Sequence, residues 1–319
     1  MKIKHFILNK IIISTAITSL LVYFLLNKID YKNIFYLFKD INYFYVLISF
    51  MFYFLLTFIR ALRIKLLVNN KISIRNLFAI ALVNNLVINI LPFRTGELSL
   101  PVLLKKYAGV EKKEGLLLLF YLRIIDTITI LTFFIIIVLL FSGNIIQLRG
   151  ASYIPILLLL SFLFLVLLKI DKIISIAGKL VKKRNHYESL NNIADSIDKL
   201  SLVYKFYKSR IKEISVLSIL IFATLIFVFG FVLRAYPIDL SYVDVIMISL
   251  IIIIITSLPV NGIAGIGTVE LGISSFLILL GINKDLSVSV AFNYHFIYLI
   301  FIIFFGSLSF LYLHYKGKA

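Results

Sequence analysis

The stretch "NILPFRTGELSLP", residues 89–101, decides how this chain folds. It places an arginine, a glutamate, a glycine and two prolines between two apolar runs of a sequence that is otherwise mostly hydrophobic. Proline lacks a backbone N–H and glycine lacks a side chain, so a helix that enters this stretch is expected to end there. The stretch therefore predicts a helix break that carries charge.

Composition makes the chain an integral membrane protein. It has 319 residues, of which 61% are hydrophobic, and a mean hydropathy of +1.06. Several apolar runs are long enough to cross a hydrocarbon core of about 30 Å, which takes roughly 20 helical residues. The apolar runs are residues 10–27, 42–59, 76–91, 98–104, 115–141, 151–168, 214–234, 242–258, 266–281 and 286–313, and not all of them can be full spans. The expected fold is an all-α, polytopic membrane helix bundle that forms one domain over residues 1–319.

Charge and reactive side chains narrow the function classes. The net charge of +18 lies mainly in loops beside apolar runs, which favours anionic membrane lipids over nucleic acid as partners. The chain has no cysteine, which excludes disulfides, thiolate metal sites and cysteine nucleophiles. Its four histidines are too scattered to predict a metal centre, and no cofactor or catalytic motif is expected.

The first helix break is predicted to form a re-entrant hairpin. Residues 60–75 carry five lysines and arginines and residues 105–113 carry four, so both ends of the region 76–104 are expected on the cytoplasmic side. Its two arms are short for full spans, and Pro92 and Gly96 interrupt the helix between them. Non-helical backbone at membrane depth is tolerated only beside protein or a wet cavity, so the "PFRTGE" tip is expected to line something polar.

The middle of the chain is predicted to cross the membrane twice and then stay in the cytoplasm. The run 115–141 leads outward and 151–168 leads back, while the run 10–27 is expected to remain as a first span. Residues 169–213 carry eleven lysines and arginines and form a predicted cytoplasmic linker. Apolar positions recur in it every three or four residues from Leu190 to Ile211, which fits an amphipathic helix that acts as a surface linker or binds anionic lipid.

The C-terminal half is predicted to repeat the first half in the opposite orientation. Repeat one covers about residues 42–141 and repeat two about 214–313, with a second hairpin at 242–281 and both termini cytoplasmic. The breaks "LPFRTGELSLPVLLKKYAGV" and "LPVNGIAGIGTVELGISSFLILLGI" each lead from Leu-Pro through glycine to a glutamate. Inverted repeats with broken segments near the bilayer midplane are the usual construction of secondary transporters.

Five ionisable side chains fall within or beside these apolar segments, where a charge costs about 2.5–3.5 kcal/mol on insertion scales. They are Arg94, Glu97, Arg123, Asp126 and Glu270. Arg94 with Glu97 and Arg123 with Asp126 are each three residues apart, so each pair can form on one face. Two interpretations stay open: the pairs hold the hairpins in the bundle, or an arginine binds a lipid phosphate while glutamates balance or relay charge.

Further polar residues in the apolar segments complete the candidate site. His295, 25 residues after Glu270 as Arg123 is 26 after Glu97, fits either a packed, hydrogen-bonded histidine or a proton relay. Asn261 is expected either to line the cavity or to make an interhelical hydrogen bond, and the same two interpretations apply to Asn84, Asn85 and Asn89. "GIAGIG", residues 262–267, does not predict a nucleotide loop, because it follows a membrane segment rather than a strand.

These motifs resemble the lysylphosphatidylglycerol synthase transmembrane-region family, the flippase-like domain found alone or fused in the multiple peptide resistance factor. The resemblance covers nearly the whole chain and rests on "IRALRIKLL" (59–67), "LPFRTGELSLPVLLKKYAGV" (91–110), "LRIIDT" (122–127) and "LPVNGIAGIGTVE" (258–270). It implies a central cavity whose charged motif sites match Arg94, Glu97, Arg123, Asp126 and Glu270. His295 departs from the pattern, since an arginine is expected there, and without a soluble aminoacyltransferase domain lysyl transfer is not expected.

The leading hypothesis is a cell-membrane flippase or transporter that moves an anionic phospholipid or lipid-linked substrate between leaflets through a polar central cavity. The candidate substrate-binding residues are Arg94, Glu97, Arg123, Asp126, Glu270, His295 and Asn261. One alternative is a membrane glycosyltransferase or other polyprenyl-phosphate enzyme, which the absence of any Asp-x-Asp or Glu-x-Asp disfavours. Another is a non-transporting scaffold for a partner synthase, and self-association stays open.

Overall fold

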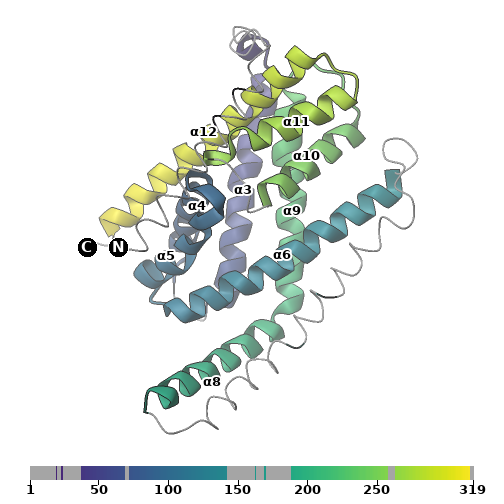
Figure 1. Cartoon of the computed structure of the whole chain (residues 1–319). Coiled ribbons are helices and arrows are strands. Elements are labelled where there is room, and N and C mark those ends of the chain that lie inside the picture. Colours follow the sequence, from purple (N-terminus) through teal and green to yellow (C-terminus); the bar gives the residue numbers. More distant parts are fainter. Residues whose placement is uncertain are drawn as a thin grey trace. The chain divides into compact units, whose positions relative to one another are not determined.

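A computed structural model describes residues 37–68, 72–141, 188–257 and 263–316, with four isolated positions besides. Every regular element in these ranges is helical (Figure 1). The helices are η1 Leu37–Lys39, α3 Tyr43–Leu67, α4 Ile74–Ile90, η2 Pro92–Leu98, α5 Ser99–Ala108, α6 Lys112–Phe141, α8 Glu188–Ser209, α9 Ile211–Arg234, α10 Tyr242–Ser257, η4 Ile263–Gly265, α11 Thr268–Leu279 and α12 Lys284–Lys316. The predicted runs 10–27 and 151–168 and Asn261 lie outside the described residues.

Four of the described helices are long and apolar enough to cross a membrane, namely α3, α6, α9 and α12. Three shorter apolar helices accompany them, namely α4, α10 and α11. The prediction of a multi-pass, all-helical membrane protein is therefore confirmed. The short helices flank the two predicted breaks, because proline and glycine at those points end each helix before it reaches the length of a span.

The described chain divides into two compact units. The first contains residues up to Ala61, residues Arg75–Ser99 and residues from Ile221 onward, and the second contains Leu62–Ile74 and Leu100–Leu220. Helices α3 and α9 each contribute one part to each unit. Both predicted helix breaks belong to the first unit.

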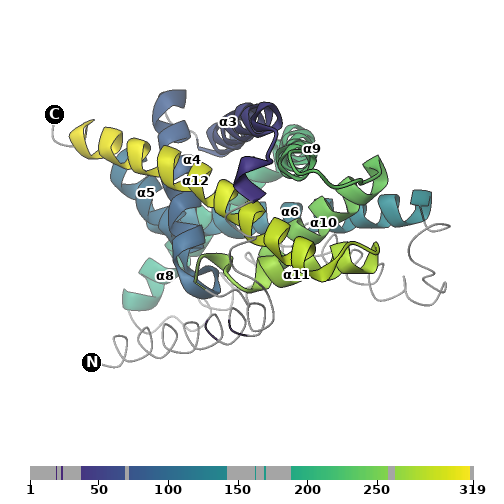
Figure 2. The ribbon, with the colours of Figure 1, turned by 90° about the horizontal axis from the view of Figure 1, so that it is seen from above.

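Aromatic side chains pack the first unit. On α3, Phe50 and Tyr53 contact Phe305 of α12, with ring centroids 4.8 and 5.8 Å apart. Helices α10, α11 and α12 lie side by side in both views (Figures 1 and 2). Helix α12 also approaches α4 closely, since a Cβ on Gly306 would lie 2.6 Å from the Cβ of Leu86. The close packing of small and aromatic residues fits a bundle held together mainly by van der Waals contact in lipid.

The second unit is organised around α6 and α8. Tyr121 of α6 packs edge-on against Tyr204 of α8 and donates a hydrogen bond of 3.0 Å from its hydroxyl to the carbonyl of Tyr207. Both tyrosines of α8 are buried, as the predicted amphipathic pattern of this segment requires. The helix predicted within the linker is thus confirmed, and its described apolar face packs on protein.

Candidate functional site

The first break turns the chain back along α4. Helix α4 ends at Ile90, Pro92 opens the short helix η2, and the Nδ2 of Asn84 donates a hydrogen bond of 2.8 Å to the Oγ of Ser99. A Cβ on Gly96 would lie 2.3 Å from the carbonyl oxygen of Val87, closer than any side chain allows. Glycine is therefore required at position 96, because η2 packs directly on the backbone of α4.

Arg94 lies at the tip of this turn in a left-handed conformation, with φ of 53°. Its Nε forms an ion pair of 3.0 Å with Oε1 of Glu97, so the pairing predicted from their spacing is present. Its Nη1 donates a hydrogen bond of 2.5 Å to the carbonyl oxygen of Ser257, the last residue of α10. The last carbonyls of a helix lack partners within the helix, so the guanidinium caps α10 and joins the two breaks.

The second break leads from α10 into α11 through η4. Ala264, Gly265 and Gly267 all have left-handed φ, at 55°, 76° and 89°. Helix α11 then runs back along α10, since a Cβ on Gly272 would lie 2.1 Å from the Cδ1 of Ile255. This break therefore also reverses the chain.

Glu270 is the buried anchor of the second break. Its Oε2 accepts a hydrogen bond of 2.7 Å from the amide of Gly267, which caps the N-terminus of α11. Its Oε1 lies 2.7 Å from the Nδ1 of His295 on α12. Their side chains are 3% and 4% exposed, so this is a buried pair of ionisable groups.

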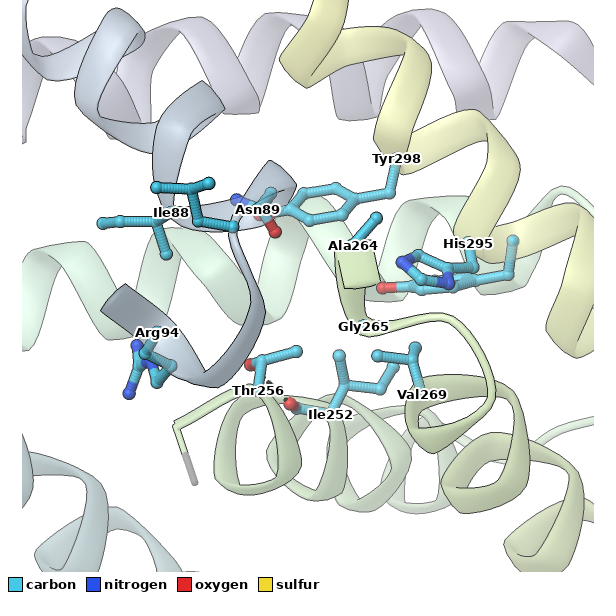
Figure 3. Close-up of a pocket in the computed structure, with 12 residues that line it drawn as sticks. Ile88, Asn89, Arg94, Ile252, Thr256, Ala264, Gly265, Val269, His295 and Tyr298 are labelled. Carbon is cyan, nitrogen blue, oxygen red and sulfur yellow. Dashed lines mark hydrogen bonds between the residues drawn. The ribbon is translucent and has the colours of Figure 1, made fainter. Parts of the chain in front are cut away.

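A small cavity lies between the two breaks (Figure 3). Its lining comprises Ile88, Asn89, Leu91, Arg94, Ile252, Thr256, Ala264, Gly265, Val269, Tyr294, His295 and Tyr298. The volume of about 40 Å³ holds a few water molecules but not a lipid headgroup. Arg94 comes from the first break and His295 from α12, so the cavity brings together two residues singled out from the sequence.

Asp126 forms an ion pair that the sequence analysis did not predict. Its partner is Arg63 of α3. The Nη2 of Arg63 donates a hydrogen bond of 3.2 Å to Oδ2 of Asp126, and its Nη1 donates to Oδ1 of the same carboxylate. The same Nη1 also donates a hydrogen bond of 2.8 Å to the Oγ of Ser218. The spacing predicts a pair of Asp126 with Arg123, three residues earlier on the same helix, whereas the bonds of Asp126 in the structure run to a different helix, α3. Arg123 lies half-buried on α6 and, like Asp126, belongs to the second unit.

The predicted asparagines have different environments. Asn85 is buried, donates a hydrogen bond of 2.7 Å to the hydroxyl of Tyr53 and accepts one of 3.5 Å from Arg60. Asn89 lines the cavity. Sequence reasoning missed Tyr294, whose buried hydroxyl has no hydrogen-bond partner, because nothing in its spacing distinguishes it from other core tyrosines.

Within the described ranges, no three histidine, aspartate or glutamate side chains gather as a metal site would require. Comparison with curated proteins and with solved structures gives no significant match. A family model described as the lysylphosphatidylglycerol synthase TM region matches residues 11–306, which is most of the sequence. The motifs singled out above all lie inside the matched range, and the chain belongs to the lysylphosphatidylglycerol synthase transmembrane-region family.

Proposed function

We propose that this protein is a flippase that moves an anionic phospholipid or lipid-linked substrate between the leaflets of the cell membrane. The observation that carries the proposal is the meeting of two helix breaks around a polar cavity, with Arg94 of one break bonded to the end of α10 at the other. Membership of a transmembrane-region family, as distinct from the synthase domain, supports transport rather than catalysis.

The proposed topology makes both breaks re-entrant hairpins. At a rise of about 1.5 Å per residue, the 17 residues of α4 extend about 25 Å and the 12 residues of α11 about 18 Å. Neither reaches the roughly 30 Å of a hydrocarbon core. The reversal of the chain at each break supports entry and exit on one side, with the two hairpins facing opposite leaflets as inverted repeats.

The proposed chemistry assigns the headgroup phosphate to Arg94. A guanidinium presents donors in a fork that matches two phosphate oxygens, and its charge is kept near the bilayer interior by Glu97. Asn89, Thr256 and the tyrosines of α12 supply further polar contacts on the cavity wall. In a non-transporting scaffold, the charges of Arg94 and Glu97 would serve packing alone. Variants that alter these charges but still fold would then show no change in lipid transfer, which distinguishes the two functions.

The test is transfer of fluorescent phosphatidylglycerol across proteoliposome bilayers, measured by dithionite quenching. We expect Arg94→Ala to reduce transfer by about tenfold or more, since it removes the charge-assisted hydrogen bonds of about 1.5–3 kcal/mol proposed to hold the phosphate. Glu97→Gln should also reduce transfer, since it removes the counter-charge of the guanidinium. Arg75→Ala, a change at an exposed arginine of α4, is the matched control and should transfer at the native rate. Native transfer by a folded Arg94→Ala protein would leave these charges with a structural role and refute the proposal.

A further inference from the structure

The buried pair of His295 and Glu270 leaves one ring nitrogen facing the cavity. Nδ1 is occupied by Glu270 at 2.7 Å. The opposite edge of the ring faces Gly265, where an added Cβ would lie 3.6 Å from Cε1 and 3.8 Å from Nε2. Both Gly265 and His295 belong to the cavity lining. A proton can therefore reach this ring from the cavity without passing through packed side chains.

A second polar group on the cavity wall points to a bound ligand. The hydroxyl of Tyr294, a residue that is 1% exposed, has no hydrogen-bond partner in the described chain. A buried polar atom of this kind costs free energy unless water or a ligand satisfies it. The cavity has room for a few waters beside Tyr294 and His295, which is the arrangement that carries protons to a buried site.

The charges around the cavity depend on the state of His295. With a neutral imidazole, the buried pair carries the single negative charge of Glu270, and protonation of His295 makes the pair neutral. Net charge is unfavourable in surroundings of low dielectric constant. Arrival of a phosphate anion adds negative charge and therefore favours protonation of His295. Linkage is reciprocal, so the protonated protein binds the anion more tightly by the same factor.

The other ionisable groups of the first unit do not replace this pair. Those near the α12 segment of His295 are Arg60, Tyr53, Tyr236 and Tyr298. The lining residues from α4 and α10 carry no ionisable side chain, and Lys39 and Asp40, in or next to the short helix packed on α12, are exposed. Arg60 stays charged and tyrosines stay neutral near pH 7, so among the described residues around the cavity the candidate proton-binding groups are the histidine and the two glutamates.

We propose that the pair of His295 and Glu270 is a proton-binding site that couples lipid movement to protons, with one proton entering for each anionic headgroup. The inference rests on the proposed function, and it adds the coupling ion. It also gives a reason for the histidine at this position, because an arginine there would stay charged at every physiological pH and could not couple.

The first experiment measures proton uptake on binding. Native protein in weakly buffered detergent is mixed with short-chain phosphatidylglycerol while a pH-sensitive dye reports free protons. We expect uptake approaching one proton per bound lipid near the midpoint of the titration, and none with zwitterionic phosphatidylcholine. His295→Asn keeps a donor for Glu270 but cannot titrate, so uptake should vanish. His314→Asn, the same change at an exposed histidine of the same helix, should leave it intact.

The second experiment separates coupling from transport. Transfer of labelled phosphatidylglycerol by the native protein should fall by up to about tenfold per pH unit as the site loses its proton, the limit for one linked proton. The transfer rate of His295→Asn should not change with pH, whatever its absolute value. Transfer without any response to pH would overturn the coupling alone, whereas no transfer by the native protein would overturn the proposed function as well. If His295→Asn does not fold, His295→Gln, which cannot bind a proton either, takes its place, and its transfer rate should likewise not change with pH.

Discussion

The ion pair between Arg63 and Asp126 offers the sharpest test of how the second unit is held together. Their side chains are 8% and 13% exposed, so solvent screens the pair weakly. Asp126→Asn removes the negative charge and leaves the buried guanidinium with one amide oxygen and the hydroxyl of Ser218 as acceptors among these three side chains. Removing one partner of a buried pair costs about 3–5 kcal/mol, because the other charge stays buried without compensation. We expect a loss of unfolding free energy in that range.

Replacing both partners should restore most of the loss. The Nε of Arg63 is buried without a hydrogen-bond partner in the described chain, so the native pair already carries a desolvation cost that apolar side chains avoid. The double variant Arg63→Met with Asp126→Leu should therefore be within about 1–2 kcal/mol of the native protein. A coupling energy of several kcal/mol between positions 63 and 126 is the expected signature of direct contact.

The assay is unfolding by sodium dodecyl sulfate in mixed micelles, followed by far-ultraviolet circular dichroism, since the chain contains no tryptophan for fluorescence. Arg123→Met is the matched control, because Arg123 was the alternative partner suggested by the sequence. Additive effects at positions 63 and 126, together with strong coupling between 123 and 126, would show that the pairing argued here is incorrect.

Three further predictions address the breaks and the surface. Gly96→Ala should lower the unfolding free energy by about 1–3 kcal/mol or more, because the added Cβ overlaps with the α4 backbone. Gly109→Ala has open space around its Cβ and should cost only the strain of a left-handed backbone, roughly 1–2 kcal/mol. Unfolding by dodecyl sulfate measures both changes. In this cysteine-free chain, Gly109→Cys should react with a membrane-impermeant maleimide from the cytoplasmic side and Asn283→Cys from the outer side, and labelling of both from the same side would refute the two oppositely oriented hairpins. The hydrogen bond and charge of Lys199 lower the pKa of Glu111, so Lys199→Met should raise that pKa toward its ordinary value, as measured by NMR titration of the carboxyl group. The stabilisation by this exposed pair is present at neutral pH and is lost as the pH falls through the lowered pKa.

The helix breaks could be predicted because local chemistry causes them. Pro92 cannot donate a helical hydrogen bond, and the lysines and arginines on either side mark where each apolar run stops. The pair of Arg94 and Glu97 was accessible for the same reason, since three residues separate the two side chains within one turn. Features determined by neighbours along the chain are those that composition and spacing reveal.

Contacts between distant segments could not be predicted from spacing. Arg63 and Asp126 lie 63 positions apart, and the sequence offered Arg123 as a nearer partner of the right charge. Glu270 and His295, 25 positions apart, were both singled out, yet nothing in the sequence indicated that they touch. Which arginine reaches an aspartate depends on how α3 and α6 pack, and packing is decided by the shapes of many apolar side chains at once.

The small size of the cavity constrains how a headgroup could be admitted. A volume of about 40 Å³ is too small for a phosphate with its glycerol, so η2 must move away from α10, which breaks the bond between Arg94 and the Ser257 carbonyl. Left-handed strain at Arg94 and Ala264, on the order of 1–2 kcal/mol at each residue, favours such a movement. What opposes it is the loss of partners for a guanidinium that is mostly buried. Only a ligand whose anionic oxygens replace Glu97 and the carbonyl removes that cost, which is why the proposed substrate carries a phosphate and a neutral lipid would leave the breaks together.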